Sequence, residues 1–383
     1  MATVYEIIRK TEAYLCQDCG KCSSVCPISR LNSGYSPRRL LTTSLKDEEK
    51  SIISNKAIWN CLTCARCLEV CPQGINYMEL TKGFRAVAHK EGEETVCSHG
   101  GAFQSLMRIM TSNKLQQDRM GWIPKSAQIK TEGDILLFVG CPPYFDVFFS
   151  DIGVKTLNAS LSTLTLLNKI GIEPVLLPNE RCCGHDLLWG GDLEHFLKLA
   201  KHNIKEIKKS GAKKVIFTCA ECFRTFKIDY NEHLGPLGFE VEHISTFLLP
   251  YIKEGKISFK PTKKRVTYQD PCRLGRHMGI YDEPRELLNA IPKLELIEMD
   301  KNKANALCCG TTAWLNCDIF SKRMQTQRLL DAKKTGADML TVACPKCEIH
   351  LKCTLNEKTN EPMQKIDIRY FTTLLSDNIK ENK

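Results

Sequence analysis

Hydrophobic positions change their spacing along the chain, and these changes divide it into regions. Residues 1–100 have helical periodicity around two dense groups of cysteines. Residues 101–132 form a polar, methionine-rich stretch that contains Pro124 and is typical of a connector. From residue 133 onward, short apolar runs alternate with longer amphipathic ones. This alternation predicts βαβ units around a mostly parallel sheet.

The alternating region predicts individual strands and helices. The apolar runs predict strands at Asp134–Val139, Pro174–Leu177, Lys214–Thr218, Val266–Gln269 and Met339–Val342. The amphipathic runs predict helices at Lys155–Ile170, Leu193–Ser210, Glu283–Ile291 and Ile319–Thr335.

The region after residue 133 contains an internal repeat with a period of roughly 125–130 residues. Residues 133–255 and 256–383 each contain a single cysteine, then an adjacent pair followed by glycine, then a Cys-x-x-Cys pair. Each single cysteine and each Cys-x-x-Cys follows a predicted strand. Because open α/β sheets bind ligands at the carboxyl ends of strands, we predict two pseudo-equivalent Rossmann-like lobes with a shared site between them.

Composition narrows the chemistry of these cysteines. The chain has 383 residues and 21 cysteines, mostly in tight groups, and its first residues lack the apolar core of a secretory signal. We therefore expect metal ligation in a reducing cytoplasm rather than disulfides. The net charge of +10 is explained mainly by solvated lysines, and no nucleic-acid motif accompanies it. No run of 18 apolar residues exists, so a membrane role requires a partner.

The N-terminal region contains the same four-cysteine pattern twice, each time ending in Cys-Pro. This spacing resembles that of bacterial two-cluster ferredoxins, in which the fourth cysteine of each run ligates the other cluster. Zinc sites use two Cys-x-x-Cys pairs, so the extra cysteines argue against zinc. The 34 residues between the runs predict one or two inserted helices, as in a helical two-cluster domain. The resemblance implies one 4Fe–4S cubane on Cys16, Cys19, Cys22 and Cys71, and a second on Cys61, Cys64, Cys67 and Cys26.

The two C-terminal cysteine sets resemble the CCG, or cysteine-rich, domains of heterodisulfide reductases. The first set is Cys141, Cys182, Cys183, Cys219 and Cys222, and the second is Cys272, Cys308, Cys309, Cys344 and Cys347. The resemblance implies one noncubane 4Fe–4S cluster per lobe, with the coenzyme M–coenzyme B disulfide, or a related anionic disulfide, reduced between them. Fusion to a ferredoxin domain is similar to the single-chain form of the catalytic subunit. That form implies an electron-donating partner, a membrane cytochrome b or a flavoprotein, and a cytoplasmic site, free or peripheral on the membrane.

Other interpretations of the C-terminal sets stay open. The adjacent cysteines suit a redox-active disulfide, and one single cysteine with a Cys-x-x-Cys suits zinc. Relatives with incomplete sets are non-catalytic relay subunits of glycolate, lactate or glycerol-3-phosphate dehydrogenases, or of sulfur metabolism. Completeness of both sets favours catalysis. The second set departs from several relatives by Thr311, Thr312 and Trp314 after its CCG, which leaves the identity of the disulfide open.

Cationic and titratable residues follow the C-terminal cysteines closely. The resemblance to an enzyme with an anionic disulfide suggests that they bind the substrate or, for the histidines, relay protons. The alternative is that the arginines balance anionic clusters or pair with nearby carboxylates. We take His185, His277, Arg273 and Arg276 as candidate catalytic residues, and Arg181 and Lys346 as further cations near the clusters.

Three cysteines and three tryptophans have no place in the motifs. Cys97, Cys317 and Cys353 are expected to be buried apolar thiols. Trp122, Trp189 and Trp314 are expected to pack in the core, with Trp314 the best candidate for a pocket wall.

Overall fold

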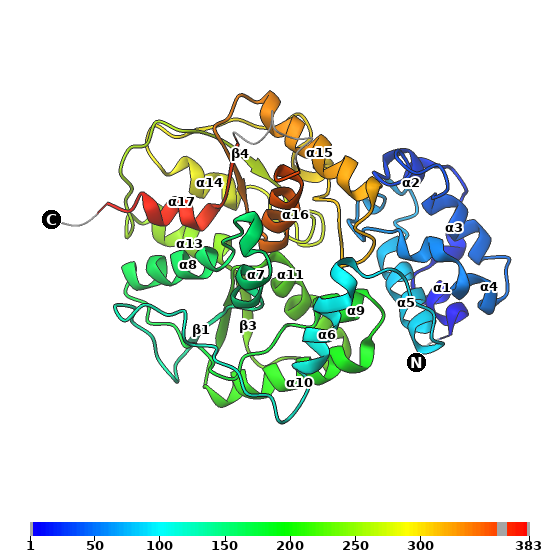
Figure 1. The fold of residues 1–383 in the computed structure, drawn as a ribbon, viewed down its shortest axis with the longest axis horizontal. Helices are drawn as coiled ribbons and strands as arrows, with labels where there is room; N and C mark the ends of the chain where they lie inside the picture. Colours follow the sequence, from blue (N-terminus) through cyan, green and yellow to red (C-terminus); the bar gives the residue numbers. More distant parts are fainter. Residues whose placement is uncertain (1–2, 358–365, 381–383) are drawn as a thin grey trace.

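The computed structural model describes residues 3–357 and 366–380. A helical N-terminal unit lies beside a larger body made of two α/β lobes, one below and one above in the view of Figure 1. The outermost positions of the predicted regions, residues 1–2 and 381–383, lie outside the described residues.

The N-terminal unit consists of short helices joined by the two cysteine loops. Local chemistry sets several helix starts: Thr3 and Glu6 form a capping box at the first helix, and Ser36 caps a helix that begins at Pro37. Two helices, α3 and α4, occupy the gap between the cysteine runs, as expected. The elements are α1 (Val4–Lys10), η1 (Ala13–Leu15), α2 (Lys21–Val25), α3 (Pro37–Ser44), α4 (Glu49–Ser54), η2 (Lys56–Trp59), η3 (Leu68–Val70), α5 (Tyr77–Lys90), η4 (Ser98–Gly101) and α6 (Ala102–Ile109).

The first lobe contains a parallel three-stranded sheet in the order β1-β2-β3. Its strands are β1 (Ile135–Phe138), β2 (Lys214–Phe217) and β3 (Glu240–His243). Its helices are α7 (Pro142–Phe148), η5 (Ser150–Ile152), α8 (Leu157–Lys169), α9 (His185–Trp189), α10 (Leu193–Lys209), α11 (Ala220–Arg224), the π-helix η6 (Thr225–Tyr230), α12 (Asn231–Leu234) and α13 (Ile244–Lys253).

The second lobe contains a parallel four-stranded sheet in the order β5-β4-β6-β7. Its strands are β4 (Arg265–Gln269), β5 (Glu295–Leu296), β6 (Met339–Val342) and β7 (Asp367–Tyr370). Its helices are α14 (Glu283–Asn289), η7 (Lys303–Asn305), α15 (Ile319–Lys334), α16 (Pro345–Leu355) and α17 (Phe371–Asp377).

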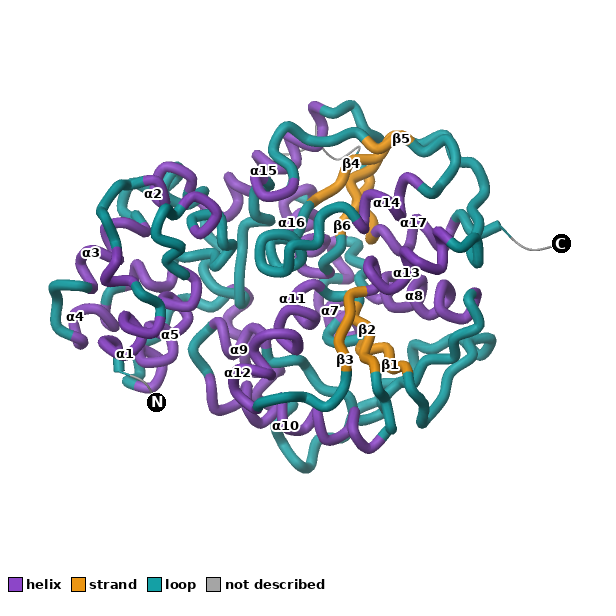
Figure 2. The backbone as a smooth tube through the Cα atoms, turned by 180° about the vertical axis from the view of Figure 1, so that it is seen from behind, coloured by secondary structure: helices purple, strands orange, loops and turns teal. Residues whose placement is uncertain are grey.

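The two lobes are equivalent in topology and exchange their last helices. The order of β1, β2 and β3 is repeated by β4, β6 and β7. Helix α13 ends the first lobe but packs on α14 of the second, and α17 ends the second lobe but packs on α8 of the first. Figure 2 shows these helices between the two sheets. The prediction of paired α/β lobes behind a helical ferredoxin-like domain is therefore confirmed.

The strand predictions need correction at the sheet edges. The predicted strand Pro174–Leu177 is reduced to bridges of Val175 with Lys130 and Leu136, since Pro174 has no N–H to donate to a ladder. Strands β3, β5 and β7 were not predicted. They are short, and β3 and β7 place charged residues such as Glu240 and Asp367 at alternate positions.

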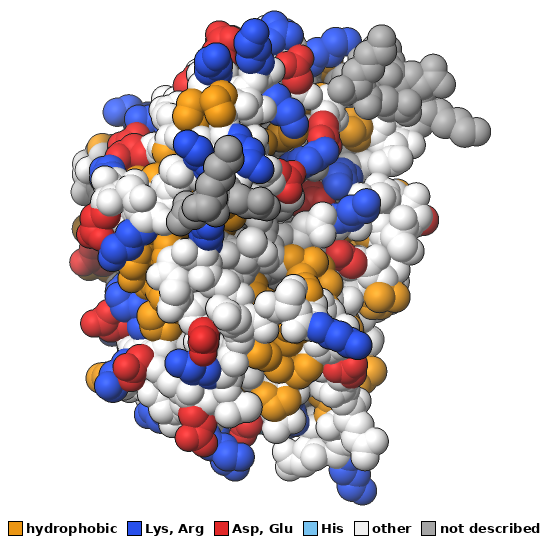
Figure 3. All heavy atoms as spheres, turned by 90° about the vertical axis from the view of Figure 1, so that its left-hand side faces the viewer, with side chains coloured by type: hydrophobic (Ala, Val, Ile, Leu, Met, Phe, Trp, Pro, Cys, Tyr) orange, Lys and Arg blue, Asp and Glu red, His pale blue; other side chains and the backbone are white. Residues whose placement is uncertain are grey.

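Surface features agree with the expected charge distribution. Among the described residues, no helix is long and apolar enough to cross a bilayer. On the face in Figure 3, acidic and basic side chains are interspersed where side chains are coloured. The net positive charge is therefore not gathered into one patch on that face.

Candidate functional site

The two N-terminal cysteine loops share one backbone conformation. In the first loop, the positions two and four residues after Cys16, Asp18 and Gly20, have positive φ angles of 52° and 76°. The corresponding positions of the second loop, Thr63 and Ala65, have φ angles of 49° and 66°. Non-glycine residues rarely adopt this region, so the same unusual curvature at matching positions indicates a common bound group.

The curved loops point backbone N–H groups at sulfur. The amide of Asp18 donates to the Sγ of Cys16 over 3.4 Å, and the amide of Thr63 donates to the Sγ of Cys61 over 3.3 Å. Such bonds stabilise a thiolate that is bound to iron. They fit the loop to an iron–sulfur cluster better than to an uncharged thiol.

Each loop lines a small cavity with a cysteine that comes from the other run. One cavity is lined by Cys16, Cys19, Cys22, Cys71 and Cys67. The other is lined by Cys26, Cys61, Cys64 and Cys67. The fold therefore brings Cys71 to the first run and Cys26 to the second, while Cys67 borders both cavities.

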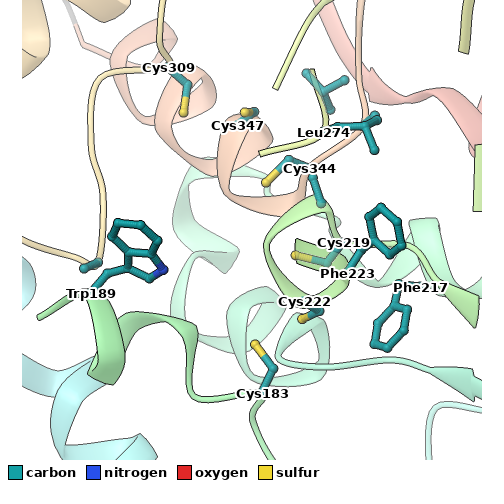
Figure 4. Close-up of a cluster of buried hydrophobic side chains, with 14 of the residues drawn as sticks. Cys183, Trp189, Phe217, Cys219, Cys222, Phe223, Leu274, Cys309, Cys344 and Cys347 are labelled. Atoms are coloured by element: carbon teal, nitrogen blue, oxygen red, sulfur yellow. The ribbon is translucent and has the colours of Figure 1, made fainter. Parts of the chain in front are cut away.

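The ten cysteines of the lobes form one continuous series of thiol contacts. Hydrogen bonds connect successive thiols in the order Cys141, Cys182, Cys183, Cys222, Cys219, Cys344, Cys347, Cys309, Cys308 and Cys272. Figure 4 shows six of these sulfurs, from Cys183 to Cys309, along a curve that crosses from one lobe to the other. The two five-cysteine sets therefore meet at the lobe interface.

Hydrogen bonds within the series favour thiolates at several positions. The thiols of Cys141 and Cys183 bond to Cys182 and hold its pKa well below its ordinary value. Bonds from Cys222 and Cys344 have the same effect on Cys219. In the second lobe, bonds from Cys308 and Cys347 lower the pKa of Cys309 to about 6. All 21 cysteines lie in the described residues and have free thiols, so these groups are available as ligands.

The interface between the lobes also holds a carboxylate. The Sγ atoms of Cys219 and Cys344 and a carboxylate oxygen of Glu221 all lie within 4.8 Å of one another. Both cysteines are buried, and the side chain of Glu221 is 12% exposed. Burial raises the pKa of Glu221. One face of this junction is thus formed by a cysteine from each lobe.

A buried ion network surrounds the junction. Lys346, from the second lobe, forms ion pairs with Asp186 and, over 2.8 Å, with Glu221 of the first lobe. Although burial acts in the opposite direction, Lys346 lowers the pKa of Asp186. Asp186 also bonds Nδ1 of His185 over 2.8 Å, and Nε of Arg273 donates to Nε2 of that histidine over 3.0 Å. The expected cation at Lys346 is therefore neutralised by two carboxylates.

Arg273 and its neighbours contact the N-terminal domain. Arg273 donates to the carbonyl oxygen of Thr63 over 2.6 Å and to its hydroxyl over 2.7 Å. Nε2 of His277 lies 2.9 Å from the same carbonyl oxygen, and burial lowers the pKa of this histidine. Arg276 donates to the carbonyl oxygen of Cys64 over 2.6 Å. These contacts place the three residues between the second lobe and the loop of Cys61, Cys64 and Cys67.

Arg181 lies apart from this network. Its guanidinium donates to the carbonyl oxygen of Met110 over 2.7 Å, and its backbone amide donates to Asn203. The structure therefore brings together five of the six predicted polar residues and leaves Arg181 at the connector.

The glycine after each cysteine pair is required by its surroundings. Gly184 and Gly310 have φ angles of 78° and 100°. A Cβ at Gly184 would lie 2.9 Å from Phe196, and one at Gly310 would lie 2.7 Å from Gln325. Glycine thus allows the first cysteine pair to pack close to α10 and the second close to α15.

The unassigned residues differ in their surroundings. Cys317 is exposed, contrary to the expected burial, because it precedes the N-cap Asp318 at the surface start of α15. Cys97 and Cys353 are only half-buried. Trp314 is buried, and its ring stacks on Phe103 with 4.1 Å between centroids.

Sequence reasoning missed the carboxylates that organise the site. Glu180 accepts the backbone amides of Val139 and Gly140 over 2.9 and 2.7 Å and pairs with Arg119 over 2.6 Å. It therefore ties the first cysteine pair to the loop of Cys141. Asp186 and Glu221 were also missed, although Asp186 lies two residues after the first Cys-Cys-Gly and Glu221 lies within the Cys219–Cys222 pair.

Comparisons with known proteins agree with this geometry. The 4Fe–4S dicluster domain family matches residues 12–75, and the cysteine-rich domain (CCG) family matches residues 135–227 and 266–352. A solved structure of a hypothetical protein from Helicobacter pylori has a TM-score of 0.58 at 11% identity, over 100% of this chain and 78% of that one, and supports the fold alone.

Curated relatives extend the match over most of the chain. The D subunit of dihydromethanophenazine:CoB–CoM heterodisulfide reductase from Methanosarcina barkeri is 37% identical over 77% of this chain and 72% of its own length. Its counterpart from Methanosarcina acetivorans is 34% identical over 88% and 87%. The B subunit of fumarate reductase (CoM/CoB) from Methanothermobacter marburgensis is 28% identical over 90% and 68%. The chain is an iron–sulfur redox protein and belongs to the family of heterodisulfide reductase D subunits.

Proposed function

We propose that the chain is the catalytic subunit of a heterodisulfide reductase and converts the coenzyme M–coenzyme B disulfide, or a related anionic disulfide, to two thiols. The observation that carries this proposal is the contact between Cys219 and Cys344, which brings two complete five-cysteine sets to one junction. Two one-electron sites on either side of one disulfide can share the two electrons that its cleavage needs.

The cysteine sets define the cofactors of the proposal. The N-terminal sets would hold two cubane 4Fe–4S clusters, and each lobe set would hold a noncubane 4Fe–4S cluster. When bound, these clusters supply single electrons and open iron positions for sulfur. Adjacent cysteines such as Cys182 and Cys183 suit a distorted cluster, because two neighbouring thiolates cannot both reach separate corners of a compact cube easily.

The polar residues of the junction have separate tasks in this proposal. Disulfide reduction also consumes two protons, and the hydrogen-bonded series of His185, Asp186 and Lys346 ends at the junction. Arg273, Arg276 and His277 all bond to the Thr63–Cys64 segment, so we assign them to positioning this loop rather than to substrate contact.

The proposal includes partners. As a member of a family of complex-forming subunits, the chain works with other proteins, and a membrane cytochrome b or a flavoprotein would donate the electrons. In either arrangement the chain would lie on the cytoplasmic side, free or peripheral on the membrane.

The test uses anaerobically purified protein with about sixteen irons per chain, as four 4Fe–4S clusters require. During turnover, coenzyme M thiol should induce a new EPR signal from a lobe cluster. Cys183→Ala should abolish disulfide cleavage while the N-terminal clusters stay reducible, and Cys97→Ala is the matched control. Full activity of Cys183→Ala would contradict the assignment of the first lobe.

The competing function is a non-catalytic electron relay in a larger oxidoreductase. It is supported if iron content is complete but coenzyme M thiol induces no signal and no disulfide is cleaved. The similarity to the B subunit of a fumarate reductase (CoM/CoB) favours this second function, because that subunit belongs to a different oxidoreductase.

A further inference from the structure

The second lobe contacts the loop of Cys61, Cys64 and Cys67 (the cubane loop) through residues that the first lobe lacks. Arg273 and Arg276 follow Cys272 by one and four residues, and the corresponding positions after Cys141 are Pro142 and Phe145. Neither proline nor phenylalanine can donate the hydrogen bonds that the two arginines make to Thr63 and Cys64. The two lobes are therefore alike in their cysteines and different in their contact with the N-terminal domain.

Arg276 lies between two ligand sets. Besides the carbonyl oxygen of Cys64, its guanidinium bonds the carbonyl oxygens of Ala304 and Ala306 over 3.1 and 2.9 Å. Against the effect of burial, the thiolates of Cys64, Cys272 and Cys308 raise its pKa, so sulfur from both domains is close to one guanidinium. Its remaining nitrogen, Nη2, is buried and has no hydrogen-bond partner in the described part of the chain, which fits an acceptor such as cluster sulfur.

A second contact joins the same cubane loop to the other cysteine segment of the second lobe. The hydroxyl of Thr63 lies 3.2 Å from that of Thr312, three residues after Cys309. The loop thus approaches the second set from both sides.

The first lobe is coupled to the N-terminal domain through other groups. Arg85 donates to the carbonyl oxygen of Trp189 over 3.0 Å, and Arg224 pairs with Glu79 over 3.0 Å. Arg85 also donates to the carbonyl oxygen of Cys61 over 2.6 Å, so the first lobe contacts this loop through an arginine of α5. The second lobe contacts it through Arg273 and Arg276, which follow its own Cys272 closely.

We infer that the two lobes receive electrons in sequence, through the second lobe first, and that Arg276 is the positioning residue that couples the Cys64 loop to the Cys272–Cys308 ligands. This order rests on the proposed function. The Sγ atoms of Cys219 and Cys344 lie within 4.8 Å of each other, and these two residues would connect the cluster of the second lobe to that of the first. Arg276 transfers no atom; it shortens the path by holding the loop against the ligands and by balancing their negative charge.

A protein-sized electron donor can test the order of reduction. Such a donor can approach the exposed Cys19 but not the lobe cysteines, which are mostly buried. Reduced bacterial two-cluster ferredoxin is mixed with the full-length, cluster-loaded chain, and the lobe clusters are followed by freeze-quench EPR and Mössbauer spectroscopy. One variant lacks the second set (Cys308→Ser with Cys309→Ser), and its matched control lacks the first set (Cys182→Ser with Cys183→Ser).

The expected results separate the order from the proposed function. Removal of the second set should slow reduction of the first-lobe cluster at least tenfold, whereas removal of the first set should leave reduction of the second-lobe cluster at the wild-type rate. An unchanged rate in the first lobe without the second set would overturn the order alone. If the wild-type protein reduces its N-terminal clusters but neither lobe cluster, the result would contradict the proposed function itself.

The role of Arg276 has its own test. Arg276→Gln should slow reduction of the second-lobe cluster at least tenfold with iron content and the cubane spectrum unchanged, and Arg276→Lys should restore part of the rate. Arg323→Gln, at an exposed position of the same lobe, is the control. An unchanged transfer rate in Arg276→Gln with full iron content would overturn this role. If Arg276→Gln does not load its clusters, the pair of cysteine variants still decides the order.

Discussion

Single residues decide how closely each cysteine pair can pack against the helix beside it. Gly310 combines a φ of 100° with a space that a Cβ would overfill, 2.7 Å from Gln325 and 2.9 Å from the carbonyl oxygen of Ser321. Gly310→Ala should therefore destabilise the protein by about 1–3 kcal/mol and reduce iron loading of the second lobe. Thermal unfolding and iron analysis measure both effects. Gly255→Ala is the control, since Gly255 also has positive φ but open space around it; equal effects of the two would contradict the crowding argument.

Glu180 is a single buried charge on which the packing around Cys141 depends. It is 2% exposed, and its carboxylate accepts two backbone amides and the Arg119 ion pair. Glu180→Gln leaves Arg119 without its counter-ion and turns an amide N–H₂ toward a donor, so we expect a loss of about 3–5 kcal/mol in unfolding free energy. Denaturant titration measures it. Glu194→Gln, which removes an exposed pair with Lys198, should change stability little, and a similar loss there would count against the argument.

At the scale of elements, the sequence predicts helices and strands with periodic apolar positions. It does not predict contacts that form only when distant parts of the chain pack together. The four predicted helices and four of the predicted strands lie within two residues of their observed bounds, because their apolar spacing is strong. The single cysteines and the Cys-x-x-Cys pairs of the lobes could be placed after strands from the sequence, but it did not show that Cys22, Cys222 and Cys347 lie in α2, α11 and α16. The partners of Arg273 could not be predicted, because Thr63 is 210 residues away and the two domains must dock before the bond exists.

Exchange of the last helices makes the lobes dependent on one another. Leu374 on α17 is fully buried, and Thr372 of the same helix bonds Ser162 of α8 over 2.8 Å. Leu374→Ala should lower the free energy of unfolding by about 2–5 kcal/mol, and both lobes should still unfold in a single transition. Denaturant titration monitored by tryptophan fluorescence measures this change. Leu330→Ala, at a position 39% exposed, is the control. Separate transitions for the two lobes would show that the exchanged helices do not couple them.

At the scale of the whole molecule, the proposed function requires the N-terminal domain to stay docked on the lobes. Docking on the first lobe depends on a buried ion cluster in which Asp229 pairs with Arg224 and, over 3.3 Å, with Lys82 of α5. Asp229 is fully buried, so Asp229→Asn leaves two buried cations short of a counter-ion. The physical expectation is a loss of about 3–5 kcal/mol that falls on the domain interface rather than on either domain core.

Asp229→Asn should therefore uncouple the N-terminal domain before it unfolds the lobes. Calorimetry should show an early transition, and limited proteolysis should cut faster near the exposed Val96. Asp338→Asn removes an exposed pair with Arg265 on the second lobe and should leave both measurements unchanged. A uniform shift of one transition in Asp229→Asn would mean that the ion cluster stabilises the whole molecule. Faster cleavage with a separate early transition would instead locate its contribution at the interface, where the Thr63–Cys64 segment also meets Arg273 and Arg276.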